Sequence, residues 1–329
     1  MPTTFTLKSR FIIYLSYRLM LGRACSFAGK ALLRYADRLG TDEGWTDEAV
    51  LRESERWVHV PRDGTRLEDE RRLLVHLPKR WGTSRVWRTW AADERLAGDL
   101  IEETIGEVLA AGGGRLVWHT GDRIGPPFMD ECLAGHGFEI REELDVLAFV
   151  LIDDSGPRLP RLGAPEGVNV GLVRDARGLR EVLRVDSEVF GSPPPSGGEF
   201  AEYDGELEKL RRLERGESLG GDESLALRFA ASVDVVFGQE GEDARREVAA
   251  AGAQLVGETL RLWGVATREE FRGRGAYKAL VLERCRVGMD FGATLALTKA
   301  NVATSSPILE RAGLGRVGTE RRHVLEIRR

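Results

Sequence analysis

The sequence predicts an α+β protein of the mixed α/β type, built from two tandem lobes. Three observations predict this class. The chain has 329 residues, about two domains by length. Residues 152–167 are rich in proline, glycine and charge, which is typical of a linker between domains. The half before this linker weakly repeats the half after it, with strands and helices in the same order.

We therefore expect four segments along the chain. They are a basic helical extension over 1–45, a first lobe over 46–151, a linker over 152–167 and a second lobe over 168–329. Six cations precede the first acid, Asp37, and this composition resembles a transit peptide. Arg18 interrupts an apolar run that is too short for a signal core. A basic amphipathic surface helix, or an extension from an upstream start codon, therefore fits better than a targeting segment.

The elements of each lobe follow from their periodicity. In the first half we expect strands at 86–90, 114–120 and 144–151, a helix over 96–108 and a short helix over 127–133. In the second half we expect strands at 260–267 and 292–298, a helix from Tyr277, a short helix over 305–309 and a final pair of strands within 316–326. Residues 235–252 read as a surface connection between strands. The loop at 191–198 and Tyr203 are candidates for acceptor contact, or a solvent loop.

The most informative segment is Arg272-Gly-Arg-Gly-Ala-Tyr277, between the strand at 260–267 and the helix that follows. A strand, a glycine loop and a helix N-terminus together bind phosphate, because backbone N–H groups and the helix dipole both favour an anion. Gly273 and Gly275 remove the side chains that would block this approach. Arg272 and Arg274 add positive charge beside it.

The loop lacks the Gly-Lys-Ser/Thr of a P-loop and the third glycine of a dinucleotide fingerprint. It resembles motif A of the Gcn5-related N-acetyltransferases, Arg/Gln-x-x-Gly-x-Gly/Ala after a strand. Arg272 and Gly275 match that pattern, and Tyr277 departs from it where a small residue is expected. The strand, Asn301, short helix and Gly313-Leu314 that follow are also similar to the family, so the resemblance covers roughly 168–329.

The resemblance implies two tandem acyl-CoA N-acyltransferase-type lobes, each a central mixed, mostly antiparallel sheet flanked by helices. It also implies that the glycine loop holds the CoA pyrophosphate and that the preceding strand pairs with the pantetheine amides. Asn301 is a further pantetheine contact, or an asparagine that completes a turn. The implied cofactor-binding residues are Val265, Ala266, Thr267, Arg272, Gly273, Arg274, Gly275, Ala276, Tyr277 and Asn301.

The first lobe lacks such a loop and is predicted to be degenerate. It has Ala92-Asp93-Glu94-Arg95 where the glycines would stand, and two carboxylates there would repel a pyrophosphate. This lobe could be a scaffold, a homodimer interface or part of the acceptor pocket.

The catalytic residues are less sharply indicated. The tyrosine acid of many family members corresponds to Leu309 here, so Ser305 or Ser306 could contact the leaving sulfur, or could cap the short helix. Glu258, just before the strand at 260–267, and His323 are the candidate bases. Each could instead be a surface residue, and a water chain could deprotonate the amine.

The resemblance implies a CoA-dependent N-acyltransferase that transfers acetyl from acetyl-CoA, or another acyl-CoA, to a small-molecule amine by direct attack in a ternary complex. The alternatives are a non-catalytic acyl-CoA-binding regulator or scaffold, and transfer to a protein N-terminus or a hydroxyl. The net charge of −5 argues against nucleic acid, and no stretch is long enough to span a membrane. Three scattered cysteines and five histidines without metal spacing predict a metal-free protein of the reducing cytoplasm.

Overall fold

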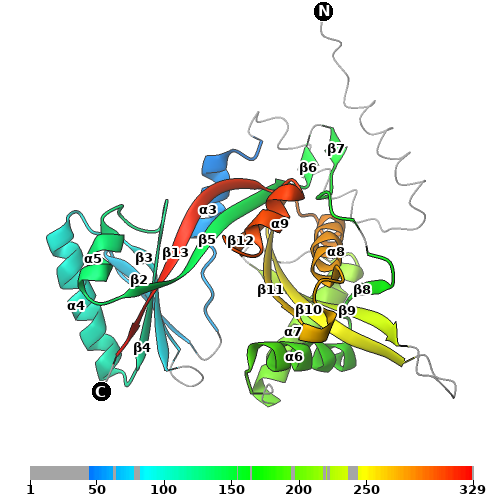
Figure 1. Cartoon of the computed structure of the whole chain (residues 1–329), viewed down its shortest axis with the longest axis horizontal. Coiled ribbons are helices and arrows are strands. Elements are labelled where there is room, and N and C mark those ends of the chain that lie inside the picture. Colours follow the sequence, from blue (N-terminus) through cyan, green and yellow to red (C-terminus); the bar gives the residue numbers. More distant parts are fainter. Residues whose placement is uncertain are drawn as a thin grey trace, which may run out of the picture. The chain divides into compact units, whose positions relative to one another are not determined.

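The computed structural model describes residues 44–61, 64–77, 82–153, 155–163, 165–193, 197–217, 220, 223–235 and 244–327. Most of the predicted N-terminal extension, 1–45, lies outside these residues. The chain divides into two compact units (Figure 1). Residues 45–148 and 297–329 make the first unit, and residues 149–296 belong to the second.

The sheet of the first unit has the strand order β1-β2-β3-β4-β13-β5. Only β3 and β4 run parallel among these neighbours, which confirms the predicted mixed, mostly antiparallel sheet. Its strands are β1 (Thr65–Glu68), β2 (Arg72–Leu77), β3 (Thr83–Thr89), β4 (Arg115–Gly121), β5 (Glu139–Val150) and β13 (Gly315–Glu326). Its helices are α3 (Asp47–Glu55), α4 (Glu94–Ala110), α5 (Met129–Gly135) and α9 (Ser306–Arg311).

The last strand of the chain, β13, lies between β4 and β5 of the first unit. Val324 pairs with Val117 on β4, and Glu320 pairs with Leu144 on β5. The sequence predicts a pair of strands over 316–326 within the second lobe, whereas the structure has one strand, grouped with the first unit. The register with β5 shifts between Arg316 and Gly318 into a β-bulge, and the strand then continues without a turn to Glu326.

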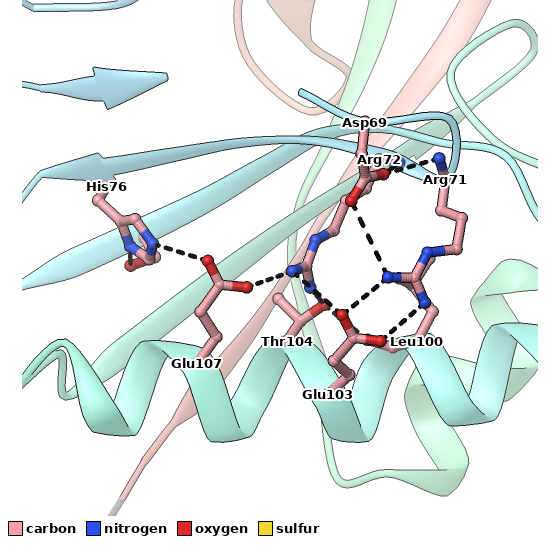
Figure 2. A network of polar contacts seen from close by, with 9 residues as sticks. Asp69, Arg71, Arg72, His76, Leu100, Glu103, Thr104 and Glu107 are labelled. Atoms are coloured by element: carbon pink, nitrogen blue, oxygen red, sulfur yellow. Dashed lines mark hydrogen bonds and ion pairs between the residues drawn. The ribbon is translucent and has the colours of Figure 1, made fainter. Parts of the chain in front are cut away.

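Helices α4 and α5 cover one face of this sheet (Figure 1). The core includes Leu100 and Ile101 of α4, Met129 of α5 and Trp118 of β4, all at most 1% exposed. Figure 2 shows a polar network that also fastens α4 to β2. In it the buried Arg72 contacts Thr104 and Glu107, and Arg71 forms a two-pronged ion pair with Glu103 at 2.7 and 2.8 Å. The acids on this face of α4 therefore serve to attach the helix.

The second unit has an antiparallel sheet in the order β8-β9-β10-β11. Its strands are β8 (Val168–Leu172), β9 (Ser224–Val235), β10 (Ala244–Val256) and β11 (Thr259–Thr267). Its helices are α6 (Ala176–Phe190), α7 (Gly197–Glu214), the 3₁₀ turn η1 (Glu269–Phe271) and α8 (Ala276–Asp290). Strand β12 (Leu295–Asn301) follows, and the division between the units falls within it.

Two of the expected connections contain regular structure. Residues 244–252, expected in a surface connection, lie in β10, because Ala249, Ala250 and Ala251 pack as buried strand residues between β9 and β11. The expected linker holds the small hairpin β6 (Ile152–Asp153) and β7 (Gly156–Pro157).

Helices α6 and α7 cover one face of the second sheet and α8 covers the other (Figure 1). Leu179, Val182 and Leu207 pack with Ala250 and Ala266 on the α6 face. On the α8 face, Gly288 lies so close to Leu260 that an added Cβ would stand 2.5 Å from the leucine side chain. This packing holds the last turn of α8 against the start of β11.

Candidate functional site

The glycine loop after β11 begins α8 with a glycine cap. Gly275 occupies the N-cap position with φ +85° and makes no side-chain capping bond. Gly273 also has a positive φ, +77°, and an added Cβ there would meet nothing within 4 Å. Both residues therefore have a backbone conformation that other residues rarely adopt. The loop exposes backbone where a side chain would otherwise stand.

The loop leaves a set of N–H donors available. Within the described part of the chain, no acceptor pairs with the backbone N–H groups of Gly273, Arg274, Gly275 and Ala276. The first N–H groups of a helix have no partner inside the helix, and the helix dipole adds positive potential at this end. The geometry therefore fits a bound anion such as a phosphate group.

Two arginine side chains flank these donors. The Nε atom of Arg272 lies 3.4 Å from the carbonyl oxygen of Thr267, and the side chain is exposed. The guanidinium of Arg274 lies 5.1 Å from the centre of the Phe271 ring. Neither arginine has a carboxylate partner among the described residues. Both charges are therefore available to an anion at the loop.

Pro165, near the end of the expected linker, packs against the loop. A Cβ added at Gly275 would stand 2.8 Å from the Cβ of Pro165. Any side chain at Gly275 would thus meet both an unfavourable φ and a stiff neighbour. The linker has a structural part in shaping the loop.

Strand β11 has a bulge at its centre. The pairs Ala250–Ala266 and Gly252–Trp263 flank it, so Gly264 and Val265 stand opposite Ala251 alone. Gly264 takes φ +56°, which a glycine adopts without strain. Of the predicted pantetheine-pairing residues, Val265 is therefore part of the bulge, and Ala266 and Thr267 lie between it and the glycine loop.

The bulge is supported from both faces of the sheet by residues that the sequence patterns did not indicate. The indole of Trp263 lies against Gly252, where an added Cβ would come within 2.5 Å of the ring. The guanidinium of Arg228 stands 5.0 Å from the centre of that indole and pairs with Asp186 on α6. From the α8 face, Arg284 donates to backbone carbonyl groups at the bulge. The sequence held one signal for this support, an arginine at 284 beside the apolar stripe of the helix that begins at Tyr277.

Glu258 lies in the turn between β10 and β11, at the end of β11 opposite the glycine loop. Its backbone carbonyl accepts from the N–H of Thr294 at 2.9 Å, and its carboxylate accepts from the Thr294 hydroxyl at 3.3 Å. Nine strand residues span about 30 Å. These contacts place Glu258 as a turn residue and do not bring it to the loop.

Asn301 and Ser306 belong to the first unit, with partners of their own. The side-chain oxygen of Asn301 accepts from the N–H of Ala303 at 3.0 Å and from the Thr304 hydroxyl at 3.2 Å, which completes a turn. The hydroxyl of Ser306 is buried and donates to Asp145 at 2.5 Å. Ser305 is the N-cap of α9 without a capping bond, so neither serine caps this helix through its side chain.

His323 is buried on β13 in the first unit. Its Nε2 atom lies 3.0 Å from Asp130 and 3.1 Å from the Thr120 hydroxyl. Burial lowers the pKa of His323, against the opposing effect of Asp130. Leu309, where many family members have a tyrosine, is buried in α9. These contacts indicate a structural role for His323.

The expected acceptor loop, 191–198, is described only in part, because 194–196 lie outside the described residues. Tyr203 is half-buried on α7, and the guanidinium of Arg228 stands 5.9 Å from its ring. Within the described ranges, no group of three or more acids, cysteines or histidines could hold a metal ion. No helix in those ranges combines the length and the apolar character that crossing a bilayer requires.

Comparison with solved structures identifies the fold. A GCN5-related N-acetyltransferase from Kribbella flavida is 16% identical, with 84% of this chain and 95% of that chain covered at a TM-score of 0.56. One from Sphaerobacter thermophilus is 19% identical, with 78% and 77% covered and a TM-score of 0.55. A tandem GNAT protein from the clavulanic acid biosynthesis pathway is 14% identical, with 91% and 94% covered and a TM-score of 0.51.

No family model and no curated protein matches the chain. The structural likeness nevertheless extends over most of its length and includes a tandem protein. The chain therefore has the fold of the Gcn5-related N-acetyltransferases, as its glycine loop predicted.

Proposed function

We propose that this protein is a CoA-dependent N-acyltransferase that uses acetyl-CoA, or another acyl-CoA, to acylate a small-molecule amine. The observation that carries the proposal is the glycine-capped start of α8. There, the backbone N–H groups of 273–276 have no acceptor among the described residues, and the side chains of Arg272 and Arg274 stand beside them without a carboxylate partner in the same ranges. Pyrophosphate is the anion of CoA that such a helix N-terminus would bind.

The reaction follows from this placement. The pyrophosphate fixes one end of the substrate, and Val265, Ala266 and Thr267 hold the pantetheine along β11. A neutral amine then attacks the thioester carbonyl, the carbon–nitrogen bond forms, and the carbon–sulfur bond breaks to release CoA thiolate. The proton lost by the amine passes to the thiolate or to solvent. Positioning of the two reactants supplies most of the rate enhancement.

Calorimetric titration with acetyl-CoA, longer acyl-CoAs and ADP tests the binding step. One site per chain is expected, with ADP binding more weakly than acetyl-CoA. Release of CoA thiol in the presence of a panel of small amines then tests transfer. Binding without amine-dependent release would favour the acyl-CoA-binding regulator or scaffold, and release only with peptides or alcohols would favour the other acceptors. No binding at all would refute the proposal.

A further inference from the structure

Arg284 of α8 is a fully buried cation, and its hydrogen bonds within the described residues all go to backbone carbonyl groups. Its Nη1 atom donates to the carbonyl oxygens of Gly252 at 2.9 Å and Trp263 at 3.3 Å, and its Nε atom donates to that of Leu280 at 3.1 Å. No carboxylate of the described chain pairs with it. Burial lowers the pKa of Arg284 to about 10, so the side chain stays charged at neutral pH.

A buried charge without a counter-ion is costly, so its position needs a reason. Nearby, Arg228 and Arg268 are also buried, but they pair with the carboxylates of Asp186 and Glu188. Carbonyl dipoles alone therefore leave a net positive charge beneath the sheet at Arg284.

The carbonyl groups that Arg284 binds mark the β11 bulge. Gly252 and Trp263 form the last regular pair before Gly264 and Val265. Arg284 thus joins α8, which begins at the glycine loop, to the centre of β11. It fixes the distance between the pyrophosphate position and the bulge.

The hydrogen bond from Arg284 to the carbonyl oxygen of Trp263 also affects the N–H group of Gly264. The carbonyl of Trp263 and the N–H of Gly264 belong to one peptide group. A carbonyl that accepts a hydrogen bond from a charged donor polarises its peptide, and the N–H becomes a stronger donor. Arg284 therefore strengthens the donor at the bulge as well as adding its own field.

We propose that Arg284 is a positioning residue of the acyl transfer, and that its buried charge beneath the bulge stabilises the negative charge that develops on the thioester. This inference rests on the proposed function. There, Val265, Ala266 and Thr267 hold the pantetheine, so the thioester beyond it comes to Gly264 and Trp263. Attack by the amine moves an electron pair onto the thioester oxygen, and its return expels the thiolate. A fixed positive charge favours both anionic species.

Stabilisation of the thiolate by Arg284 would let the reaction proceed with leucine at 309, where many family members have a tyrosine acid. Where no tyrosine stands ready to protonate the leaving sulfur, a lower pKa of the departing thiol serves the same end. A thiolate that is stable at neutral pH needs no proton donor.

Free CoA is a probe of this charge that requires no acceptor. Its thiol, bound to the protein, is titrated by thiolate absorbance in wild type, Arg284→Lys and Arg284→Gln. The pKa of the bound thiol should lie below that of free CoA in wild type and in Arg284→Lys, which keeps the cation. It should return upward by about one unit in Arg284→Gln, which keeps a donor but no charge. Arg286→Gln, an exposed change on the same helix, should leave it unchanged.

The outcomes separate this inference from the proposed function. If wild type does not bind CoA in calorimetry, the proposed function fails. If CoA binds but its thiol titrates as it does free in solution, the role of Arg284 is excluded without any variant. The same follows if CoA binds to all variants and Arg284→Gln titrates like wild type, because a purely structural arginine would alter stability alone. If Arg284→Gln does not fold, Arg284→Met, which also removes the charge but keeps most of the side-chain volume, takes its place in the titration, and a wild-type value in that variant overturns the inference.

Discussion

The starts of α4 and α8 follow equivalent strands in the two halves of the chain, but they are capped in opposite ways. In α4 the N-cap is Asp93, whose carboxylate accepts from the N–H of Leu96 at 2.8 Å. In α8 the N-cap is Gly275, with no side-chain bond. One helix end has its own internal anion, and the other leaves its donors to a ligand.

There is space for a ligand beside the start of α4. A surface depression of about 550 Å³ lies beside the segment that leads into α4, lined in part by Trp90, Ala92 and Arg123. What differs is charge, because Asp93 and Glu94 stand where an anion would bind. The comparison teaches that the N-cap residue, together with the charges beside it, separates a helix end that holds its own carboxylate from one that is open to an anion.

The largest expected effect comes from giving α8 the cap of α4. Gly275→Asp should weaken acetyl-CoA binding at least about 100-fold, because the new carboxylate takes the free N–H groups and repels the pyrophosphate. Calorimetric titration measures this loss. Gly257→Ala is the matched control, since Gly257 also has a positive φ in the second unit but lies in the β10–β11 turn. Equal loss in both variants would attribute the effect to backbone strain.

A smaller effect is expected from the loop cations. Arg272→Gln and Arg274→Gln should each weaken acetyl-CoA binding about tenfold, since each removes one charge-assisted contact to phosphate. Binding by wild type should also weaken with added salt, and more steeply than binding by the variants. Calorimetry at two salt concentrations measures both quantities. If neither variant differs from wild type, the pyrophosphate lies elsewhere.

The two units should also respond differently to acid. All five histidines lie in the first unit, and burial lowers the pKa of His59, His119 and His323. His119 is fully buried, stacked on Trp87 with the ring centres 4.2 Å apart. In the second unit, burial raises the pKa of Asp186 and Asp290, so acid does not cost that unit stability through these groups.

The sign of the acid effect follows from proton uptake. A histidine whose folded pKa is lowered stabilises the fold above its unfolded pKa of about 6.5, and that stability is lost as the pH falls below this value. One histidine that stays neutral when folded lowers the free energy of unfolding by about 1.4 kcal/mol between pH 7.5 and 5.5. Urea unfolding at both pH values should show this loss in wild type. His119→Phe should recover about that amount, and an unchanged pH dependence would show that another group is responsible.

The sequence predicts the loop and the cap difference well, because both depend on neighbouring residues. Gly273, Gly275 and Asp93 carry their conformational and charge preferences wherever the chain places them. The course of β13 could not be predicted, because strand pairing between distant segments leaves no local pattern. The pair of strands expected within 316–326 is one strand, with a bulge between Arg316 and Gly318.

In the candidate site too, the residues that depend on contacts between distant segments could not be predicted from the sequence. Val265, Ala266 and Thr267 follow from their distance to the loop along one strand. Asn301, Ser306 and His323 were assigned from sequence position alone, and the structure gives each a partner within the first unit. Arg284 and the bulge depend on contacts between α8, β10 and β11, which no spacing in one sequence reveals.

The smallest effect is expected at the N-cap of α4. Asp93→Ala removes the cap of α4 and should lower the free energy of unfolding by about 1 kcal/mol, since the N–H of Leu96 loses its acceptor. It should leave acetyl-CoA binding unchanged at one site per chain, because removing one acid supplies neither the glycines nor the arginines of the α8 loop. Urea unfolding and calorimetry on the same preparation measure both. A second binding site in Asp93→Ala would mean that this single carboxylate is all that closes the first lobe to CoA.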